Sequence, residues 1–126
     1  MKPFLLFFCL VSILLTACSK SIQSRVIGTW RLVAYTDAST QRVLHIPTDS
    51  TVVLIFHFST YEELVNNVQK RSGIYRITTP GNGYPYTDLY FDHSVANQID
   101  FRHDTMVLTA QMMTANSPNQ LQYVRN

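Results

Sequence analysis

Short strand-like segments separated by turn residues recur every 8–14 residues from Val26 to the end of the chain. Apolar and polar residues alternate within these segments, which is the pattern of a half-buried β-strand. The segments follow one another without a long helix between them, and this predicts an all-β antiparallel barrel or sandwich. The expected strands are 29–36, 41–46, 51–58, 72–78, 86–92, 98–103, 105–112 and 121–125.

The phase of the alternation predicts which side chains face the interior, because residues two apart on a strand share a face. In the segment 51–58 both faces are apolar, so Val53 and Ile55 on the second face need a cover. A loop, the segment 61–68 folded as a helix, or a second subunit would each supply it. The side chains expected to point inward are Trp30, Leu32, Ala34, Leu54, Phe56, Phe58, Tyr75, Met106 and Leu108.

The segment 61–70 is compatible with two secondary structures. The residues around its start match a helix capping box, and its apolar residues repeat at helical spacing. Asn66 and Asn67 lie in mid-segment, however, where asparagine is a poor helix former. These asparagines, together with the family resemblance described below, favour a strand, with a helix as the alternative.

The N-terminus has the pattern of a secretory signal. Lys2 precedes an uncharged apolar run over residues 4–15. A helix of that length spans roughly 18 Å, which is short of the roughly 30 Å hydrocarbon core of a bilayer. The following Leu15-Thr16-Ala17-Cys18 resembles a bacterial lipobox, in which small residues precede the cysteine that receives the lipid. The alternative is an ordinary secretory signal cut after Ala17.

The lipobox resemblance implies a division of the chain into a signal peptide (1–17), a lipidated Cys18 with a tether (18–25), and a folded domain (26–126). The two cysteines of the sequence are Cys9 and Cys18, so processing would leave no thiol for a disulfide, a zinc site or a nucleophile. Two or three acyl chains on Cys18 would anchor the protein stably. The expected location is the bacterial cell envelope, in the outer membrane because Ser19 rather than aspartate follows the cysteine.

Charge and motif content exclude or disfavour several classes of function. The formal net charge is +2, and the longest basic run is Lys70-Arg71, which excludes a nucleic-acid partner. A Gly-x-Ser-x-Gly motif is absent, and the adjacent Glu62 and Glu63 would face opposite ways on a strand. The alternation places no polar cluster inside the expected fold. We therefore expect no catalytic residues, no enzymatic activity and no cofactor.

One group of metal-ligand residue types occurs near the C-terminal half of the chain. Histidine and carboxylate side chains can bind divalent metals. The spacing of these residues matches no known site, and adjacent residues on a strand point to opposite faces. The sequence therefore predicts a solvated hairpin and no metal site. The residues concerned are Asp92, His93, Asp100, His103 and Asp104.

Several motifs occur in an order that resembles the small lipocalin-like domains of bacterial envelope lipoproteins. Gly28-Thr29-Trp30 provides the Gly-x-Trp that opens the first strand of lipocalins, and later segments follow in the same order over residues 26–126. The resemblance implies a short antiparallel up-and-down β-barrel of about eight strands. It also implies that Arg125 packs across the indole of Trp30. The chain is shorter than classical lipocalins and lacks their C-terminal helix.

The resemblance implies a non-catalytic binding lipoprotein for a small apolar or amphiphilic molecule. Its ligand-binding cavity would be lined by Trp30, Phe56, Tyr75 and Tyr123. The alternative is an accessory or surface module with a filled barrel core that binds a protein or a glycan through its loops. The expected partners are the lipid anchor and a small hydrophobic ligand, while a second copy of the chain or another protein is left open.

The lipobox leads to a direct prediction. Replacing Cys18 with alanine should leave the domain folded but release it from the membrane, because no other apolar segment of the mature chain is expected to anchor it. Fractionation of cells that express the variant measures this release. Integral membrane association of Cys18→Ala would contradict the lipoprotein interpretation.

Overall fold

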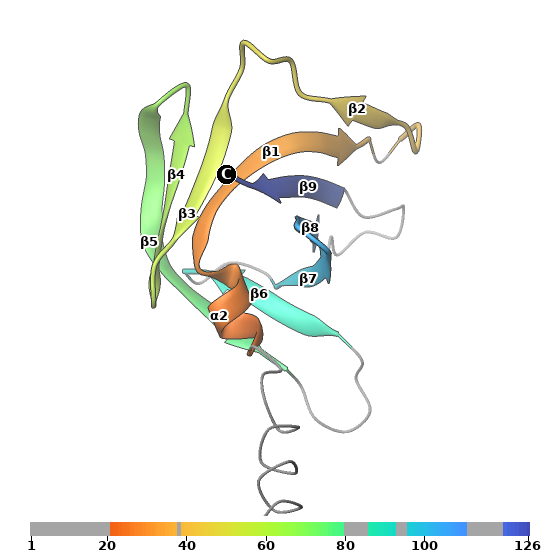
Figure 1. The fold of residues 1–126 in the computed structure, drawn as a ribbon. Coiled ribbons are helices and arrows are strands. Elements are labelled where there is room, and N and C mark those ends of the chain that lie inside the picture. Colours follow the sequence, from red (N-terminus) through yellow and green to blue (C-terminus); the bar gives the residue numbers. More distant parts are fainter. Residues whose placement is uncertain (1–20, 38, 80–85, 93–95, 111–119) are drawn as a thin grey trace, which may run out of the picture.

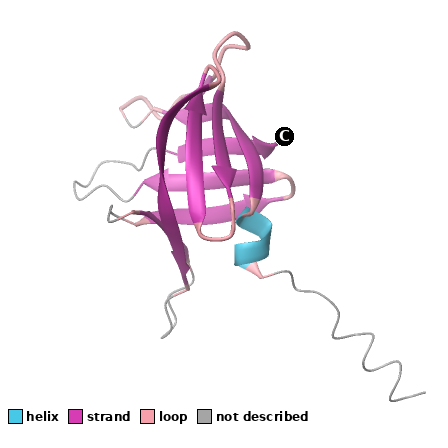
Figure 2. Ribbon diagram, turned by 90° about the vertical axis from the view of Figure 1, so that its left-hand side faces the viewer, coloured by secondary structure: helices cyan, strands magenta, loops and turns pink. Residues whose placement is uncertain are grey.

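The computed structural model describes residues 21–37, 39–79, 86–92, 96–110 and 120–126. These residues form a closed antiparallel β-barrel of eight strands with one additional strand and a short helix, as shown in Figures 1 and 2. The all-β barrel predicted from the sequence is therefore confirmed. The elements are α2 (Ile22–Val26), β1 (Gly28–Thr36), β2 (Val43–His45), β3 (Val52–Phe56), β4 (Thr60–Val65), β5 (Val68–Thr78), β6 (Thr87–Phe91), β7 (Asn97–Arg102), β8 (Thr105–Ala110) and β9 (Gln120–Arg125).

The barrel has up-and-down topology. From β3 to β9 each strand pairs antiparallel with the next one in the sequence, and β9 pairs with β1 to close the barrel. The two halves of β1 have different partners on their other edge. The first half pairs with β3 from Gly28 to Arg31, and the second pairs with β2 from Ala34 to Thr36. The strand β2 is therefore the additional strand, which pairs with the second half of β1 and is not one of the eight strands of the closed barrel.

The segment 61–70 forms a β-hairpin, so the helix alternative is wrong. Val65 at the end of β4 pairs with Val68 at the start of β5. Between them Asn66 and Asn67 have φ angles of 50° and 63°, and two successive positive φ angles are what a type I′ hairpin turn requires. The Asn66 side chain also accepts a hydrogen bond of 2.9 Å from the backbone N–H of Thr51. Asparagine tolerates this conformation, which explains the pair in mid-segment.

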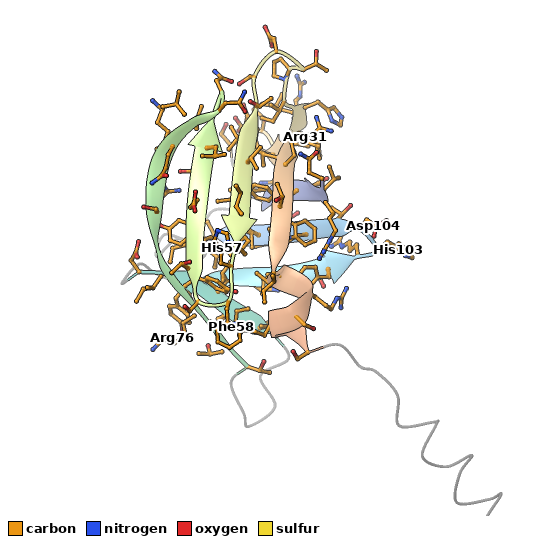
Figure 3. All side chains as sticks on the ribbon, turned by 60° about the vertical axis from the view of Figure 1, so that its left-hand side comes forward. Arg31, His57, Phe58, Arg76, His103 and Asp104 are labelled. Carbon is orange, nitrogen blue, oxygen red and sulfur yellow. The ribbon has the colours of Figure 1, made fainter. Side chains whose placement is uncertain are left out.

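The predicted inward face is buried, with one exception. Phe58 was expected inside, but it is 77% exposed and lies at the tip of the β3–β4 connection (Figure 3). The strand β3 ends at Phe56, and the backbone N–H of His57 donates to the carbonyl of Thr60 to form a tight turn. Alternation does not continue through that turn. The expected residues that are buried are Trp30, Leu32, Ala34, Leu54, Phe56, Tyr75, Met106 and Leu108.

The segment 18–25, interpreted from sequence as an irregular tether, contains most of the helix α2. Ser21 caps the helix by accepting a 3.3 Å hydrogen bond from the backbone N–H of Ser24. Ile22 and Val26 are four residues apart, so they share one face of the helix and pack against the barrel core. Tertiary packing thus stabilises a helix too short to form alone. No helix among the described residues is long and apolar enough to cross a membrane.

Trp30 joins α2 to the first and last strands. Its indole N–H donates a 2.7 Å hydrogen bond to the carbonyl of Val26. The Arg125 guanidinium lies over the ring at 4.7 Å from its centroid, which is the arrangement expected from the lipocalin resemblance. Arg125 also donates a 2.6 Å hydrogen bond to the carbonyl of Arg25. Gly28 has a φ of 135° and passes close to the guanidinium, which explains the glycine of the Gly-x-Trp motif.

The second apolar face of β3 is half-buried by its neighbours. In register, Val53 lies between Arg31 of β1 and Leu64 of β4, while Ile55 lies beside Glu62. The segment 61–68 does not cover this face as a helix, because its residues form β4 and the start of β5. Side chains of adjacent strands therefore shield part of this face from water.

Arg125→Ala should lower the free energy of unfolding by about 1–2 kcal/mol, because it removes the cation–π contact with Trp30 and the hydrogen bond to the helix. Chemical denaturation of the folded domain measures the change. Arg102→Ala is the matched control, since Arg102 makes an exposed ion pair with Asp100, and its effect should stay below about 0.5 kcal/mol. Equal effects of the two substitutions would contradict the structural role of Arg125.

Candidate ligand-binding site

The barrel contains a half-open cavity of about 540 Å³. This volume lies within the range of about 300–1,000 Å³ that is typical of small-molecule sites. The cavity therefore meets the size requirement for a binding site. Its walls consist of Leu54, Tyr61, Glu63, Arg71, Phe91, Asp92, Asn97, Leu108, Leu121 and Tyr123.

The cavity lies one layer beyond the core that packs on α2. Inward-facing residues occur at every second position, so each strand contributes to successive layers of the interior. Near α2, Trp30, Phe56 and Met106 are almost fully buried and fill the barrel. Two positions further from α2 on β3 and β8, the smaller Leu54 and Leu108 replace Phe56 and Met106, and space remains between them.

The sequence predicts four ligand-binding residues, and the structure places one of them in the cavity wall. Tyr123 lines the cavity. Trp30, Phe56 and Tyr75 pack in the filled layer and do not line it. The rings of Phe56 and Tyr75 meet edge to face at 5.0 Å, and the Tyr75 hydroxyl donates a 2.7 Å hydrogen bond to the carbonyl of His57. These three aromatic residues therefore form the floor beneath the cavity.

An ion pair lies in the cavity wall. Glu63 of β4 and Arg71 of β5 are register partners beside a bulge, and the guanidinium binds both carboxylate oxygens at 2.6 and 3.2 Å. The side chain of Glu63 is 16% exposed, whereas that of Arg71 is 63% exposed. The hydrogen bond that Arg71 donates to Glu63 raises the pKa of Arg71. The pair therefore places a satisfied carboxylate inside and its guanidinium partner toward solvent.

A second carboxylate enters the wall from the end of β6. Asp92 accepts a 2.9 Å hydrogen bond from the Tyr61 hydroxyl and a 3.0 Å bond from the backbone N–H of Ile74. Its carboxylate occupies the space that a side chain at position 73 would take, since a Cβ on Gly73 would overlap it. Burial and the bond to Asp92 raise the pKa of Tyr61. Glycine at 73 thus makes room for this carboxylate.

Tyr123 contributes its side chain to the cavity wall. The residue is 3% exposed. Burial raises the pKa of this tyrosine, and the negative charge of Glu63 adds to the effect. Tyr123 is therefore a neutral polar group close to the ion pair.

The polar cluster in the cavity corrects the expectation that no polar cluster lies inside the fold. Tyr61 and Glu63 are two residues apart on β4, so both point inward. This spacing is visible in the sequence once the segment is assigned as a strand, but a helical assignment hides it. Arg71 and Asp92 carry no such signal, because a bulge and a chain reversal bring them to the cavity.

The residues considered for a metal site are dispersed. Asp100 pairs with Arg102 at 3.4 Å, while His103 and Asp104 lie in the β7–β8 turn (Figure 3). In the described part of the chain, no three His, Cys, Asp or Glu side chains come close enough to bind one ion. His93 and the predicted lipidation residue Cys18 lie outside the described residues.

Comparison with protein-family models, with curated proteins and with solved structures finds no match for this chain. The similarity to lipocalin-like domains stays a hypothesis that rests on the sequence motifs.

The buried tyrosines predict a loss of stability in alkali. Burial raises the pKa of Tyr61, Tyr75 and Tyr123 in the folded chain above the ordinary value of 10.0. Above that pH the unfolded chain releases protons that the folded chain retains, so the free energy of unfolding should fall as pH rises. Tyr123→Phe should make this fall shallower, as measured by chemical denaturation at a series of pH values. If the free energy of unfolding falls equally steeply with pH in Tyr123→Phe, the raised pKa of Tyr123 in the folded chain is contradicted.

Proposed function

We propose that this chain is a lipid-anchored protein of the bacterial cell envelope whose barrel binds a small apolar or amphiphilic molecule without catalysing a reaction. The observation that supports this function is the half-open cavity of about 540 Å³ inside the barrel. A filled interior would have required that any binding occur through the loops. The space above the aromatic floor instead suits a ligand of modest size.

The cavity wall has an apolar part and a polar part, as small-molecule sites commonly do. Burial of an apolar ligand surface contributes about 25 cal/mol per Å². The ion pair, Asp92 and the Tyr123 hydroxyl would orient a polar group of the ligand. The apolar part consists of Leu54, Phe91, Leu108 and Leu121.

The position of α2 is compatible with a lipid anchor at Cys18. The helix closes the end of the barrel opposite the cavity layer, and its cap Ser21 is three residues after Cys18. Three residues of extended chain span at most about 11 Å. An anchored Cys18 would hold α2 and the exposed Phe58 beside it near the bilayer, since Gln23 donates a 2.9 Å hydrogen bond to the Phe58 carbonyl. The cavity would then face away from the membrane.

One observation favours the alternative, a surface module that binds a protein. In the described structure β2 pairs with β1 alone, so its other edge carries no strand. Val43 and Leu44 on β2 are exposed large apolar side chains. An exposed strand edge with apolar residues can pair with an extended segment of another protein.

A substitution that fills the cavity distinguishes the small-molecule carrier from the surface module. Leu121→Trp should reduce binding of a small amphiphile at least about tenfold, because the larger ring would occupy the space between the strands. Native mass spectrometry of gently purified protein should show a bound molecule in the unchanged protein and not in the variant. Leu44→Trp, on the exposed β2, is the control and should keep the ligand.

Unchanged binding in Leu121→Trp, or a single ligand-free mass together with no binding of added amphiphiles, would overturn the carrier function. Loss of binding to a protein partner in Leu44→Trp alone would support the surface module.

A further inference from the structure

The charges in the cavity wall do not balance. Two carboxylates, Glu63 and Asp92, face one guanidinium, Arg71, which leaves a net charge of −1. Arg71 is committed to Glu63 through two hydrogen bonds. The two hydrogen-bond donors to Asp92 are neutral, and no basic side chain of the described residues forms an ion pair with it. Its negative charge is therefore available to a ligand.

Three aromatic rings line the same cavity, and their faces attract cations. The rings belong to Tyr61, Phe91 and Tyr123, and those of Tyr61 and Phe91 meet at 4.7 Å with an interplanar angle of 64°. The Tyr61 hydroxyl also donates a hydrogen bond to Asp92, so one of the aromatic side chains directly contacts the uncompensated carboxylate. Aromatic side chains combined with a nearby negative charge are the groups that recognise ammonium ions.

The same wall is unfavourable to an anion. The guanidinium of Arg71 would be the natural partner of a ligand carboxylate or phosphate. To bind it fully, such a ligand would have to displace Glu63, whose side chain is 16% exposed and would lose its ion partner. A buried carboxylate without a partner is costly, and Asp92 would repel the ligand as well.

We infer that the cavity binds an amphiphile with a cationic head, an alkylammonium compound, in preference to an anionic amphiphile of the same chain length. The alkyl chain packs on the leucine side chains, and the ammonium group lies among the aromatic rings next to Asp92. This inference rests on the proposed function and specifies the ligand class of the same cavity. The leucines are Leu54, Leu108 and Leu121.

Calorimetric titration with three probes of equal chain length tests the inference. The probes are decyltrimethylammonium, decanol and decanoate, with the two ionic probes kept below their micelle-forming concentrations and decanol kept below its solubility limit. The cationic probe should bind at least about tenfold more tightly than decanoate, a difference of about 1.4 kcal/mol. The affinity for decanol should lie between the other two affinities, since its neutral head group is neither attracted nor repelled by the negative charge of the cavity wall.

Two matched substitutions test whether the charge of Asp92 causes the preference for the cationic probe. Asp92→Asn removes the charge while keeping an oxygen that accepts from the Ile74 N–H and an amide N–H that can donate to the Tyr61 hydroxyl, and it should abolish most of the cationic advantage. Asp100→Asn makes the same change of net charge at an exposed carboxylate of β7 and should preserve the advantage. An advantage that persists in Asp92→Asn would overturn the assignment to this carboxylate.

The probe series on the unchanged protein separates the inference from the proposed function. Equal binding of the three probes, or tighter binding of decanoate, would overturn the cationic preference while leaving a small-molecule carrier in place. Binding of none of the three would overturn both.

Discussion

Trp30 connects the three parts of the chain whose contact closes the barrel. Its indole donates to the carbonyl of Val26 at the end of α2, and the guanidinium of Arg125 lies across its face. Arg125 in turn binds the carbonyl of Arg25. The first strand, the last strand and the helix are thus held around one side chain that is 1% exposed. Closure of an antiparallel sheet removes its open edges, and the contact between the register partners Trp30 and Arg125 adds to the pairing of β1 with β9 that achieves it.

The interior of the closed barrel has two layers. Beside α2, large aromatic side chains fill the cross-section, and Val26 and Ile22 seal that end of the barrel. In the next layer leucines, a few polar residues and the rings of Tyr61, Phe91 and Tyr123 surround the cavity. A filled floor provides the rigidity of a packed core, while the open layer provides room for a ligand. The division follows from side-chain size at alternating positions of the same strands.

The polar groups in the open layer give the cavity its chemical character. Each carboxylate is satisfied in a different way, since Glu63 has a charged partner in Arg71 whereas Asp92 has neutral donors. Both arrangements consist of hydrogen bonds between groups of the chain itself, so the fold organises the wall. Such preorganisation lowers the cost of ordering side chains when a ligand enters. The local bulge beside Glu63 and the missing side chain at Gly73 make both arrangements geometrically feasible.

The alternation of apolar and polar residues in the sequence predicted the all-β fold, and the lipocalin resemblance implied the contact between Trp30 and Arg125. Alternation is a local property, because neighbours on a strand face opposite ways whatever lies beyond them. It therefore identified Leu54, Phe56 and Met106 as inward-facing. It misplaced Phe58, because a turn ends the alternation at a point set by the pairing of β3 with β4.

Only the tertiary structure decided the helix, the hairpin and the site. The helix α2 is stable because Ile22 and Val26 pack against the end of the barrel. Asn66 and Asn67 form a turn because β4 and β5 pair on either side of them. The cavity depends on the summed volumes of side chains from several strands. Arg71 and Asp92 reach it through a bulge and a chain reversal, and local patterns cannot specify such long-range geometry.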